Sequence, residues 1–354
     1  MMRKLLYITG GIVLSFVAVF LGSKLFKADR NKGFHRKIIE QDFYIAKVLQ
    51  LPSGAYYFVD HAERGLYLKD LKQANSLFIT GHDLSRVHRV NLSPIPGIDD
   101  KRKKINIGVS DTIIHAIDHK TGQVTLLNKM TRKIRRFKEP QVRIDNTILI
   151  SDQSLIGRST IINGAITGRQ LIKLNYSEAK TKNTFQLEKQ VDGYFCTDGL
   201  LRYDPAAGRL IYMYVYRGEF LCLDTNLNLL YKSKTIDTVS RAEITVNRKV
   251  NNGQLVSVTQ SKPPKPVNRN LIVHRNLVFM VSTIKADNEA KTDFKSNQVI
   301  DVYAINSGKY LYSFYIPKYL GLKLNDFRIA DDFMFAVFGT NLVKFKFNKA
   351  ALLL

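Results

Sequence analysis

Apolar and polar residues alternate along most of the chain after residue 50, in short runs that end at turn-forming residues. A clear example runs from Val299 to Ile305, turns at Asn306-Ser307-Gly308, and resumes from Lys309 to Phe314. A period of two places successive side chains on opposite faces of a strand, and a Gly-bearing turn between two such runs predicts a β-hairpin. Helical periodicity is hard to find in this part of the chain. The pattern therefore predicts an all-β fold.

Looser copies of this hairpin fall into six groups along the chain. They cover residues 55–80, 104–137, 146–174, 199–232, 271–314 and 327–347. The groups recur about every 45–50 residues, which is the length of a four-stranded propeller blade. The sequence therefore predicts a six-bladed β-propeller over residues 38–354. The alternative is a β-sandwich with a smaller β-domain, whose strands have similar spacing, and the spacing of the groups favours the propeller.

The sixth group is one strand short. A propeller closes by pairing its last blade with a strand from the other end of the chain, which leaves no open edge. Residues 38–51 read as a short helix or a strand, and Phe43 to Leu51 could supply the missing strand. Two polar insertions, Ser261–Pro266 and Lys285–Asn297, are expected to form loops at a rim of the disc, the second of them mobile.

The N-terminal segment predicts a membrane anchor. Residues Leu5 to Gly22 carry no charge and follow Arg3 and Lys4, and they are about long enough to cross a hydrocarbon core of roughly 30 Å. A cleaved signal peptide is the alternative, but no A-x-A site follows the apolar stretch. We therefore expect a transmembrane helix over residues 1–23 and a basic juxtamembrane stalk over residues 24–37.

The side of the membrane is less directly indicated. Counting basic residues on both flanks would place the large domain in the cytoplasm, but long domains translocate largely regardless of charge. We expect the propeller to lie on the extracytoplasmic (periplasmic) side of the cytoplasmic membrane.

The chain is strongly basic, with 54 Lys and Arg against 30 acidic residues and a net charge of +24. Such a charge favours anionic partners such as phospholipid head groups. The candidate contacts to an anionic surface lie in two clusters: Lys101, Arg102, Lys103 and Lys104, and Arg132, Lys133, Arg135 and Arg136. A solvated basic surface explains the same residues, and nothing else favours nucleic acid as a partner. Trp is absent, which excludes WD-repeat blades and the Trp-docking signatures of quinoprotein dehydrogenases.

No motif in the sequence assigns a catalytic residue, cofactor or metal. HExxH, Gly-rich phosphate loops and GxSxG are all missing. Aspartates end several strands, where we expect them to bond the backbone of the following turn: Asp60, Asp70, Asp118, Asp152, Asp204 and Asp224. Cys196 and Cys222 are the only cysteines. They could form a disulfide in an extracytoplasmic domain, or pack separately as small core residues.

The hairpins Ile113–Leu127 and Ile300–Phe314 resemble blades of the six-bladed propellers that include the NHL-repeat and TolB-like families. The resemblance covers roughly residues 50–350 and implies a fold, because no family catalytic motif matches a numbered residue here. Our hypothesis is a membrane-tethered, non-enzymatic binding or scaffold module for an envelope protein or an anionic ligand. The alternative is a metal-dependent, lactonase-like or lyase-like propeller hydrolase with its site at the mouth of the central channel.

Overall fold

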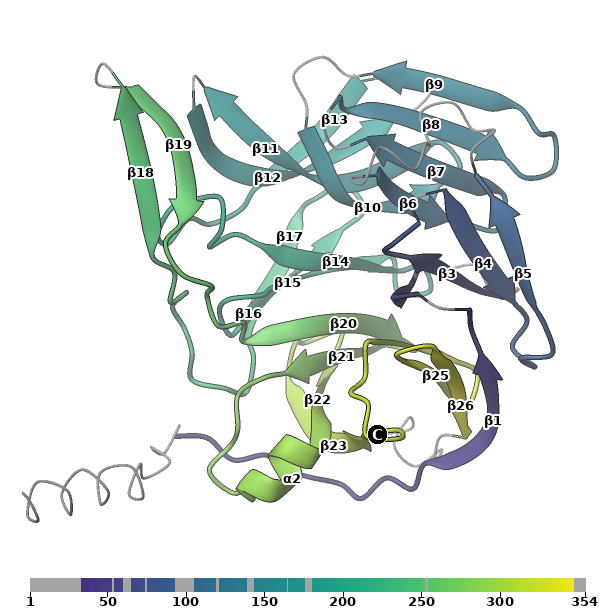
Figure 1. Cartoon of the computed structure of the whole chain (residues 1–354). Coiled ribbons are helices and arrows are strands. Elements are labelled where there is room, and N and C mark those ends of the chain that lie inside the picture. Colours follow the sequence, from purple (N-terminus) through teal and green to yellow (C-terminus); the bar gives the residue numbers. More distant parts are fainter. Residues whose placement is uncertain are drawn as a thin grey trace, which may run out of the picture.

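Six four-stranded antiparallel sheets surround a common axis in the computed structural model of this chain, which is a six-bladed β-propeller (Figure 1). The structure describes residues 33–346 except for 53, 60–64, 74, 93–104, 119–120, 139–142, 164, 176–179 and 252–253. All six groups of hairpins predicted from the sequence are blades in this arrangement. The alternative of two facing sheets is excluded.

The blades are numbered here in chain order, and each begins at the channel with its inner strand. Blades 1 and 2 contain β2 (Tyr56–Phe58), β3 (Leu66–Asp70), β4 (Ser76–Thr80), β5 (Val87–Asn91), β6 (Ile105–Val109), β7 (Ile113–Asp118), β8 (Gln123–Asn128) and β9 (Ile134–Lys138). Blades 3 and 4 contain β10 (Arg143–Ser151), β11 (Ser154–Asn163), β12 (Ala165–Asn175), β13 (Lys180–Gln186), β14 (Gly199–Asp204), β15 (Arg209–Tyr214), β16 (Glu219–Asp224) and β17 (Leu229–Lys234). Blades 5 and 6 contain β20 (Asn268–His274), β21 (Leu277–Ser282), β22 (Asn297–Ala304), β23 (Tyr310–Pro317), β24 (Asp326–Ala330), β25 (Phe333–Phe338), β26 (Asn341–Lys346) and, from the N-terminal side, β1 (Tyr44–Gln50).

Apolar side chains fill the junction between each pair of neighbouring blades. The junction of blades 5 and 6, for example, packs Phe279 and Phe314 against Phe327 and Met334, and the other five junctions hold clusters of the same kind. Strands in the middle of a blade have such a junction on both faces, so β21 is buried along its whole length. This two-sided burial explains why these strands read as nearly continuous apolar runs.

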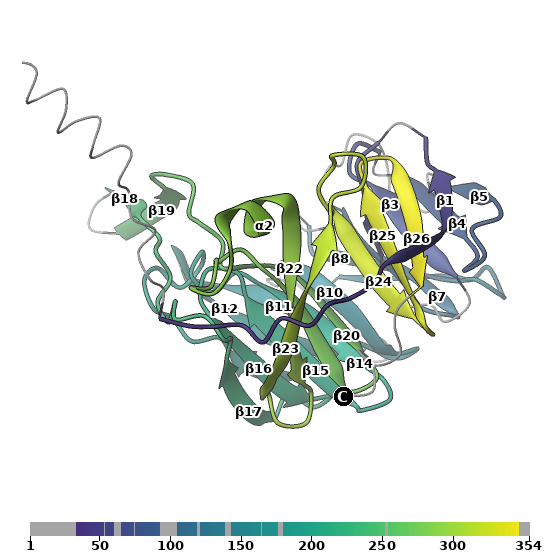
Figure 2. The ribbon, with the colours of Figure 1, turned by 90° about the horizontal axis from the view of Figure 1, so that it is seen from below.

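The ring is closed by β1, as the sequence predicts. It pairs antiparallel with β26, and Val48 lies opposite Val343 and Leu49 opposite Leu342. Further upstream, Ile38 makes a parallel bridge to Ser313 on the outer strand of blade 5. The chain therefore crosses the outer edge of blade 5 before it completes blade 6 (Figure 2).

Because strands alternate in direction, the connections divide between two faces of the disc. We call the face where the inner strands end the mouth face. We call the other face, which carries the connections between second and third strands and between consecutive blades, the rear face. Two elements outside the blades lie on the rear face: the hairpin β18 (Val246–Asn251) and β19 (Gln254–Gln260) between blades 4 and 5, and helix α2 (Lys291–Ser296) between β21 and β22. Figure 2 shows them on the same side of the disc. The predicted loop Ser261–Pro266 follows β19 and leads into blade 5.

The prediction of a mobile loop at Lys285–Asn297 is wrong, because the segment contains α2 and its Glu289 is buried and ion-paired with Arg36.

The tight turn at Asn306–Gly308 has the expected chemistry. Gly308 has a φ of +68°, and a Cβ there would lie 2.7 Å from Tyr231 and Ser233. Residues 5–22, the predicted anchor, lie outside the described residues, and no helix among those described is long and apolar enough to cross a membrane.

Candidate functional site

A cavity of about 540 Å³ opens at the mouth of the central channel and is bounded by blades 1, 4, 5 and 6. Its wall is formed largely where inner strands end, with Phe58, Asp204, His274 and Arg328 among the lining residues. We call it the mouth cavity. Phe58, Val273 and Ile329 make part of the wall apolar, whereas Asp204, His274 and Arg328 place charged or polar groups within it. The arrangement is typical of sites that bind small molecules.

His274 ends β20 and is the group in this wall best suited to proton transfer. Burial first, and the nearby Arg275 charge second, lower the pKa of His274 below its ordinary value. The imidazole is therefore neutral at pH 7. The backbone of Asp331 makes a hydrogen bond with the ring, while Nε2 is buried and has no hydrogen-bond partner in the part of the chain that is described. A neutral ring held in this way has one nitrogen left to accept a proton or a hydrogen bond.

Asp204 stands at the end of β14, on the same wall. Its Oδ1 accepts hydrogen bonds from the backbone N–H groups of Ala206 (3.0 Å) and Ala207 (3.2 Å). Its Oδ2 is buried, and no described residue donates to it. Burial and the Asp204 charge together raise the pKa of Tyr203. A buried carboxylate oxygen without a donor is costly to the fold, so a donor group on a ligand would stabilise it.

Hydrogen bonds join the inner strands of neighbouring blades around the channel. Asn270 Nδ2 donates to Asp326 Oδ1 (2.6 Å), and the backbone N–H of Phe58 donates to Asp326 Oδ2 (2.7 Å). On the opposite side of the ring, Asn106 donates to Thr147 (3.1 Å), and Asn146 Nδ2 donates to the carbonyl of Gly199 (2.8 Å). These bonds tie successive blades together.

A second cavity of about 300 Å³, bounded by blades 2, 3 and 4, lies beside the first and shares Pro205 with it. His115 lines it, is fully buried, and lies 3.1 Å from Thr147 through Nε2. Asp152 lines it too and accepts a hydrogen bond from Thr112. Among the described residues, no three His, Cys, Asp or Glu side chains gather as a metal site.

Four of the strand-end aspartates, Asp70, Asp118, Asp204 and Asp224, follow the predicted turn chemistry, whereas Asp152 accepts from the Thr112 side chain. Asp118 accepts from the N–H of Thr121 (3.3 Å), and Asp224 from those of Asn226 (2.8 Å) and Asn228 (2.9 Å). Asp70 likewise accepts from the N–H of Lys72 (2.9 Å). Asp204 serves its turn too, but it also contributes to the cavity, and Asp60 lies outside the described residues.

The basic candidates separate into one cluster that the structure describes and one that it does not. Lys101, Arg102, Lys103 and Lys104 lie outside the described residues. Arg132, Lys133, Arg135 and Arg136 are exposed on the β8–β9 hairpin at the outer edge of blade 2. Of these, Lys133 and Arg135 line one groove of about 320 Å³ together with Asp152 and Gln153. The groove is not part of the mouth cavity.

The structure does not join the two cysteines. Both are free and buried. Cys196 packs with Ala242 and Ile244 beneath the β18–β19 hairpin, whereas Cys222 packs in the cluster between blades 4 and 5. Each serves as a small core residue, the second of the two possibilities that the sequence left open.

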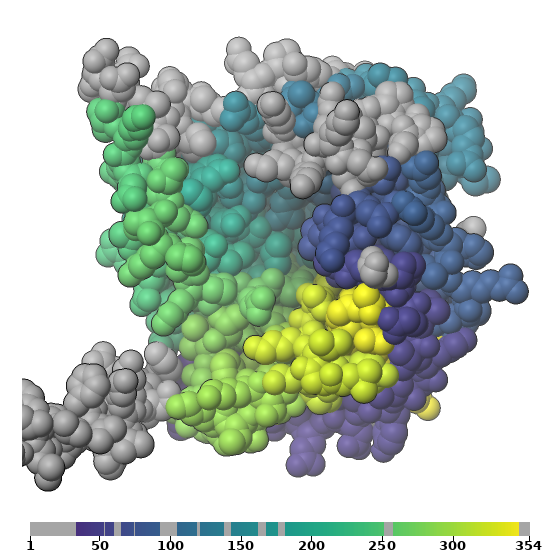
Figure 3. Space-filling model, in the orientation of Figure 1, coloured from purple at the N-terminus to yellow at the C-terminus, as the bar shows by residue number. Residues whose placement is uncertain are grey.

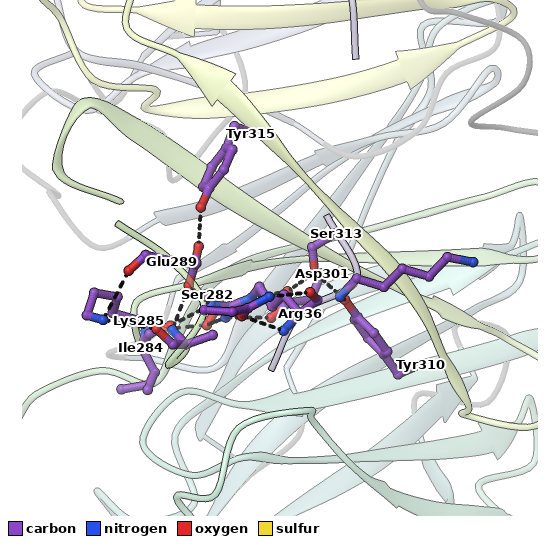
Figure 4. Close-up of polar contacts among 12 residues, drawn as sticks. Arg36, Ser282, Ile284, Lys285, Glu289, Asp301, Tyr310, Ser313 and Tyr315 are labelled. Carbon is purple, nitrogen blue, oxygen red and sulfur yellow. Dashed lines mark hydrogen bonds and ion pairs between the residues drawn. The ribbon is translucent and has the colours of Figure 1, made fainter. Parts of the chain in front are cut away.

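A second polar cluster, which sequence reasoning missed, holds the N-terminal segment against blade 5 (Figure 4). The Arg36 guanidinium is buried and bonds Asp301 Oδ1 through Nε (2.7 Å) and Oδ2 through a terminal nitrogen (3.0 Å). It also pairs with Glu289 and donates to Ser282 Oγ (2.8 Å) and the carbonyl of Ile284 (2.9 Å). We call these residues the Arg36 latch.

The carboxylates of the Arg36 latch have further donors. Tyr315 donates to Glu289 Oε1 and Ser313 to Asp301 Oδ1, each over 2.6 Å. Burial alone would lower the Arg36 pKa, but hydrogen bonds to Asp301 and Glu289 and their charges outweigh burial and raise it above its ordinary value. Every nitrogen of the guanidinium has an acceptor. The latch is therefore a structural fastening and leaves no group open to a ligand.

The mouth-cavity residues could have been found from one sequence signal. Asp204 and His274 each follow directly on the apolar run that opens a blade, and Arg328 lies within such a run. In a propeller the first strand of each blade lines the channel, so the ends of first strands meet at one mouth. Arg36 carries no such signal, because Asp301 lies 265 positions further along the chain.

Comparison with known proteins supports the fold and no more specific relationship. Neither a protein-family model nor a curated protein matches the sequence. Among solved structures, a member of the DUF4221 family from Bacteroides vulgatus is 11% identical, with a TM-score of 0.52 over 87% of this chain and 98% of that one. A catalytically inactive histidine-to-alanine variant of virginiamycin B lyase from Staphylococcus aureus, with quinupristin, is 9% identical, with a TM-score of 0.50 over 86% and 99%. A streptogramin B lyase structure is 10% identical, with a TM-score of 0.48 over 87% and 98%.

Proposed function

We propose that this chain is a membrane-tethered β-propeller that binds a small amphipathic ligand in the mouth cavity, with residues 5–22 as the tether. One observation carries the proposal: Asp204 Oδ2 and His274 Nε2 are buried, have no hydrogen-bond partner among the described residues, and belong to residues that line one cavity of about 540 Å³. The volume is within the range of about 300–1,000 Å³ that is usual for small-molecule sites.

The lining indicates the chemistry of the ligand. Phe58, Val273 and Ile329 suit an apolar body, which would be drawn out of water. Asp204 Oδ2 suits a hydrogen-bond donor, and a neutral His274 Nε2 suits a second donor. Arg275, at the rim, adds a cation near the opening. A molecule with an apolar centre and two donor groups would satisfy the wall.

Tryptophan fluorescence tests the binding site directly, because the chain has no Trp of its own. Tyr67→Trp places a single reporter in the cavity wall, and Ser307→Trp places a matched reporter on an exposed turn of the same face, outside the cavity. Titration with a library of amphipathic amines and alcohols should shift emission at 67 and leave emission at 307 unchanged. Asp204→Asn should weaken the response at 67 about 10-fold or more, since it replaces a charged acceptor. If the library shifts the emission of neither tryptophan, or shifts both equally, the binding site is refuted.

Acid–base catalysis is a second candidate, and His274 is the residue that favours it. Its lowered pKa keeps it neutral, and the bond to the Asp331 backbone holds the ring, as expected of a general base. A lyase of this fold is inactive when a histidine is replaced by alanine, which supports the comparison without transferring its substrate.

Quinupristin is the probe for this second candidate. The chain would be incubated with it and the products weighed by mass spectrometry. A lyase splits a bond without adding water, so the products sum to the substrate mass, whereas a hydrolase adds one water. Turnover that His274→Gln abolishes and that is retained by His88→Gln, which changes an exposed histidine on the outer strand β5, would support catalysis. An unchanged substrate mass, together with a ligand response at position 67, would leave binding as the function.

A further inference from the structure

The N-terminal segment meets the propeller on the rear side, away from the mouth cavity. The N–H of Gly33 donates to Asp287 Oδ2 (2.8 Å), and the N–H of Asp287 donates to the carbonyl of Phe34 (3.0 Å). The N–H of Arg36 donates to Asn288 (3.0 Å). Residues 287 and 288 belong to the connection between β21 and β22, which lies on the rear face. With the Arg36 latch, these bonds fix where residue 33 leaves the disc.

The rear face also exposes aliphatic side chains at the tips of its connections. Leu71 is 71% exposed between β3 and β4, Val250 is 58% exposed near the tip of the β18–β19 hairpin, and Leu320 and Leu322 are 75% and 42% exposed between blades 5 and 6. Among the described connections of the mouth face, Met130 alone is a large exposed apolar residue, at 83%. Exposed aliphatic groups at loop tips on one face mark a surface that meets something apolar.

Basic residues flank each of these tips. Lys72 follows Leu71, Arg248 and Lys249 precede Val250, and Lys318 and Lys323 bracket Leu320 and Leu322; all five are exposed. Helix α2 adds Lys291 and Lys295 on the same face. Figure 3 looks onto this face, where the green β18–β19 hairpin and the yellow segment of blade 6 lie toward the viewer. Aliphatic tips between cations are the pattern of a membrane-surface contact, because the tips enter the interface while the cations bind anionic head groups.

We infer that the rear face lies against an anionic phospholipid bilayer and that the mouth cavity therefore opens away from the membrane. The inference rests on the proposed tether, since residues 5–22 would hold the disc at the bilayer by the same side. The rear face adds a second contact with the bilayer, and two contacts fix the orientation of the disc relative to the membrane, whereas the tether alone would leave it variable.

Site-specific fluorescence in nanodiscs tests the orientation. An environment-sensitive maleimide dye would be attached to Leu320→Cys, Val250→Cys or Met130→Cys in the full-length chain. Cys196 and Cys222 are fully buried and should not react. Met130 is a matched control: it is aliphatic, exposed and flanked by Lys129 and Arg132, but it lies on the mouth face. In phosphatidylglycerol nanodiscs the dyes at 320 and 250 should be shielded from iodide, and the dye at 130 should not.

Each basic residue removed from the rear face should weaken its binding to the anionic bilayer by a similar factor. A basic residue close to an anionic surface is worth about fivefold in partitioning, so Lys318→Gln with Lys323→Gln should shift the docked–undocked equilibrium at the 320 dye about 30-fold. Phosphatidylcholine nanodiscs should give the same loss of shielding. Equal quenching at 320 and 130 in anionic nanodiscs would overturn the inference.

The proposed membrane tether and the proposed lipid contact of the rear face can be refuted separately. If the chain does not co-elute with nanodiscs, the tether is refuted, and the same labelled variants are then mixed with phosphatidylglycerol vesicles. Shielding at 320 on vesicles would support the surface on its own, whereas no shielding would refute both. Shielding at 320 that needs an added soluble protein and no lipid would overturn the lipid in favour of a protein partner.

Discussion

Replacing Arg36 with methionine should destabilise the whole propeller, although the residue lies before the first strand. Methionine keeps an unbranched side chain about as long as the aliphatic part of arginine and removes the guanidinium group with its charge. It leaves Asp301 and Glu289, which are 1% and 6% exposed, as buried carboxylates without their cation. Breaking a buried ion pair by removing one partner costs about 3–5 kcal/mol. Since total stability is about 5–15 kcal/mol, the loss would be a large part of it.

Chemical unfolding in detergent, followed by far-UV circular dichroism, measures this loss. Arg36→Met should lower the urea midpoint by the equivalent of about 3–5 kcal/mol with an unchanged slope. Arg36→Lys should lie between it and the wild type, because an ammonium keeps the charge but not the fork that bonds Asp301 through two nitrogens. Lys37→Met is the matched control: Lys37 is the neighbouring cation, is exposed, and should change stability by less than about 0.5 kcal/mol.

A combined variant separates ion pairing from packing. Arg36→Met with Asp301→Asn and Glu289→Gln leaves no buried charge, and it should recover part of the loss because neutral amides are far cheaper to bury. If Arg36→Met unfolds at the wild-type midpoint, or if the triple variant is less stable than Arg36→Met alone, the reasoning is wrong.

Three further predictions concern pH and closure. The pKa of His274 is lowered in the folded state, so its neutral form contributes stability above the unfolded pKa of about 6.5. This stability is lost as pH falls through the folded pKa, and His274→Gln should therefore make the urea midpoint depend less on pH below about pH 6.5. Burial lowers the pKa of Lys69 to about 8 from 10.5, so stability should rise from about pH 8 to 9.5, by about 1–2 kcal/mol; Lys69→Met should lack that rise, and an identical rise in both proteins would contradict it. Deleting residues 38–51 removes the strand paired with β26 and should abolish cooperative unfolding by calorimetry; a soluble, cooperatively melting truncation would show that closure is dispensable.

The fold could be predicted because its signals are local. Each blade repeats an alternation and a turn within about 45–50 residues. Because blade 6 is one strand short, the sequence also predicts that a segment near the N-terminus completes it. The β18–β19 hairpin was not anticipated as a separate element. Its alternation resembles that of any blade strand, and only the packing of Ala242 and Ile244 on Cys196 distinguishes it.

The site could be predicted only in part, since it depends on contacts between distant residues. Asp204 is predicted only to bond its own turn, and His274 receives no predicted role, because the convergence of strand ends is visible only in three dimensions. Arg36 was assigned to a solvated stalk on the strength of its basic neighbours. Its charge instead serves residues 289 and 301, and no local pattern reports a pairing over that separation.

The pairing of β1 with β26 has a consequence for biogenesis. Residues 44–50 leave the ribosome long before their partners at 341–346 are translated. Five blades must therefore wait as an unclosed arc with two exposed β-edges, a form prone to aggregation. Nascent chains of this protein should depend on chaperones until residues 341–346 have been synthesised, and ribosome stalling shortly before position 341 should trap the open form.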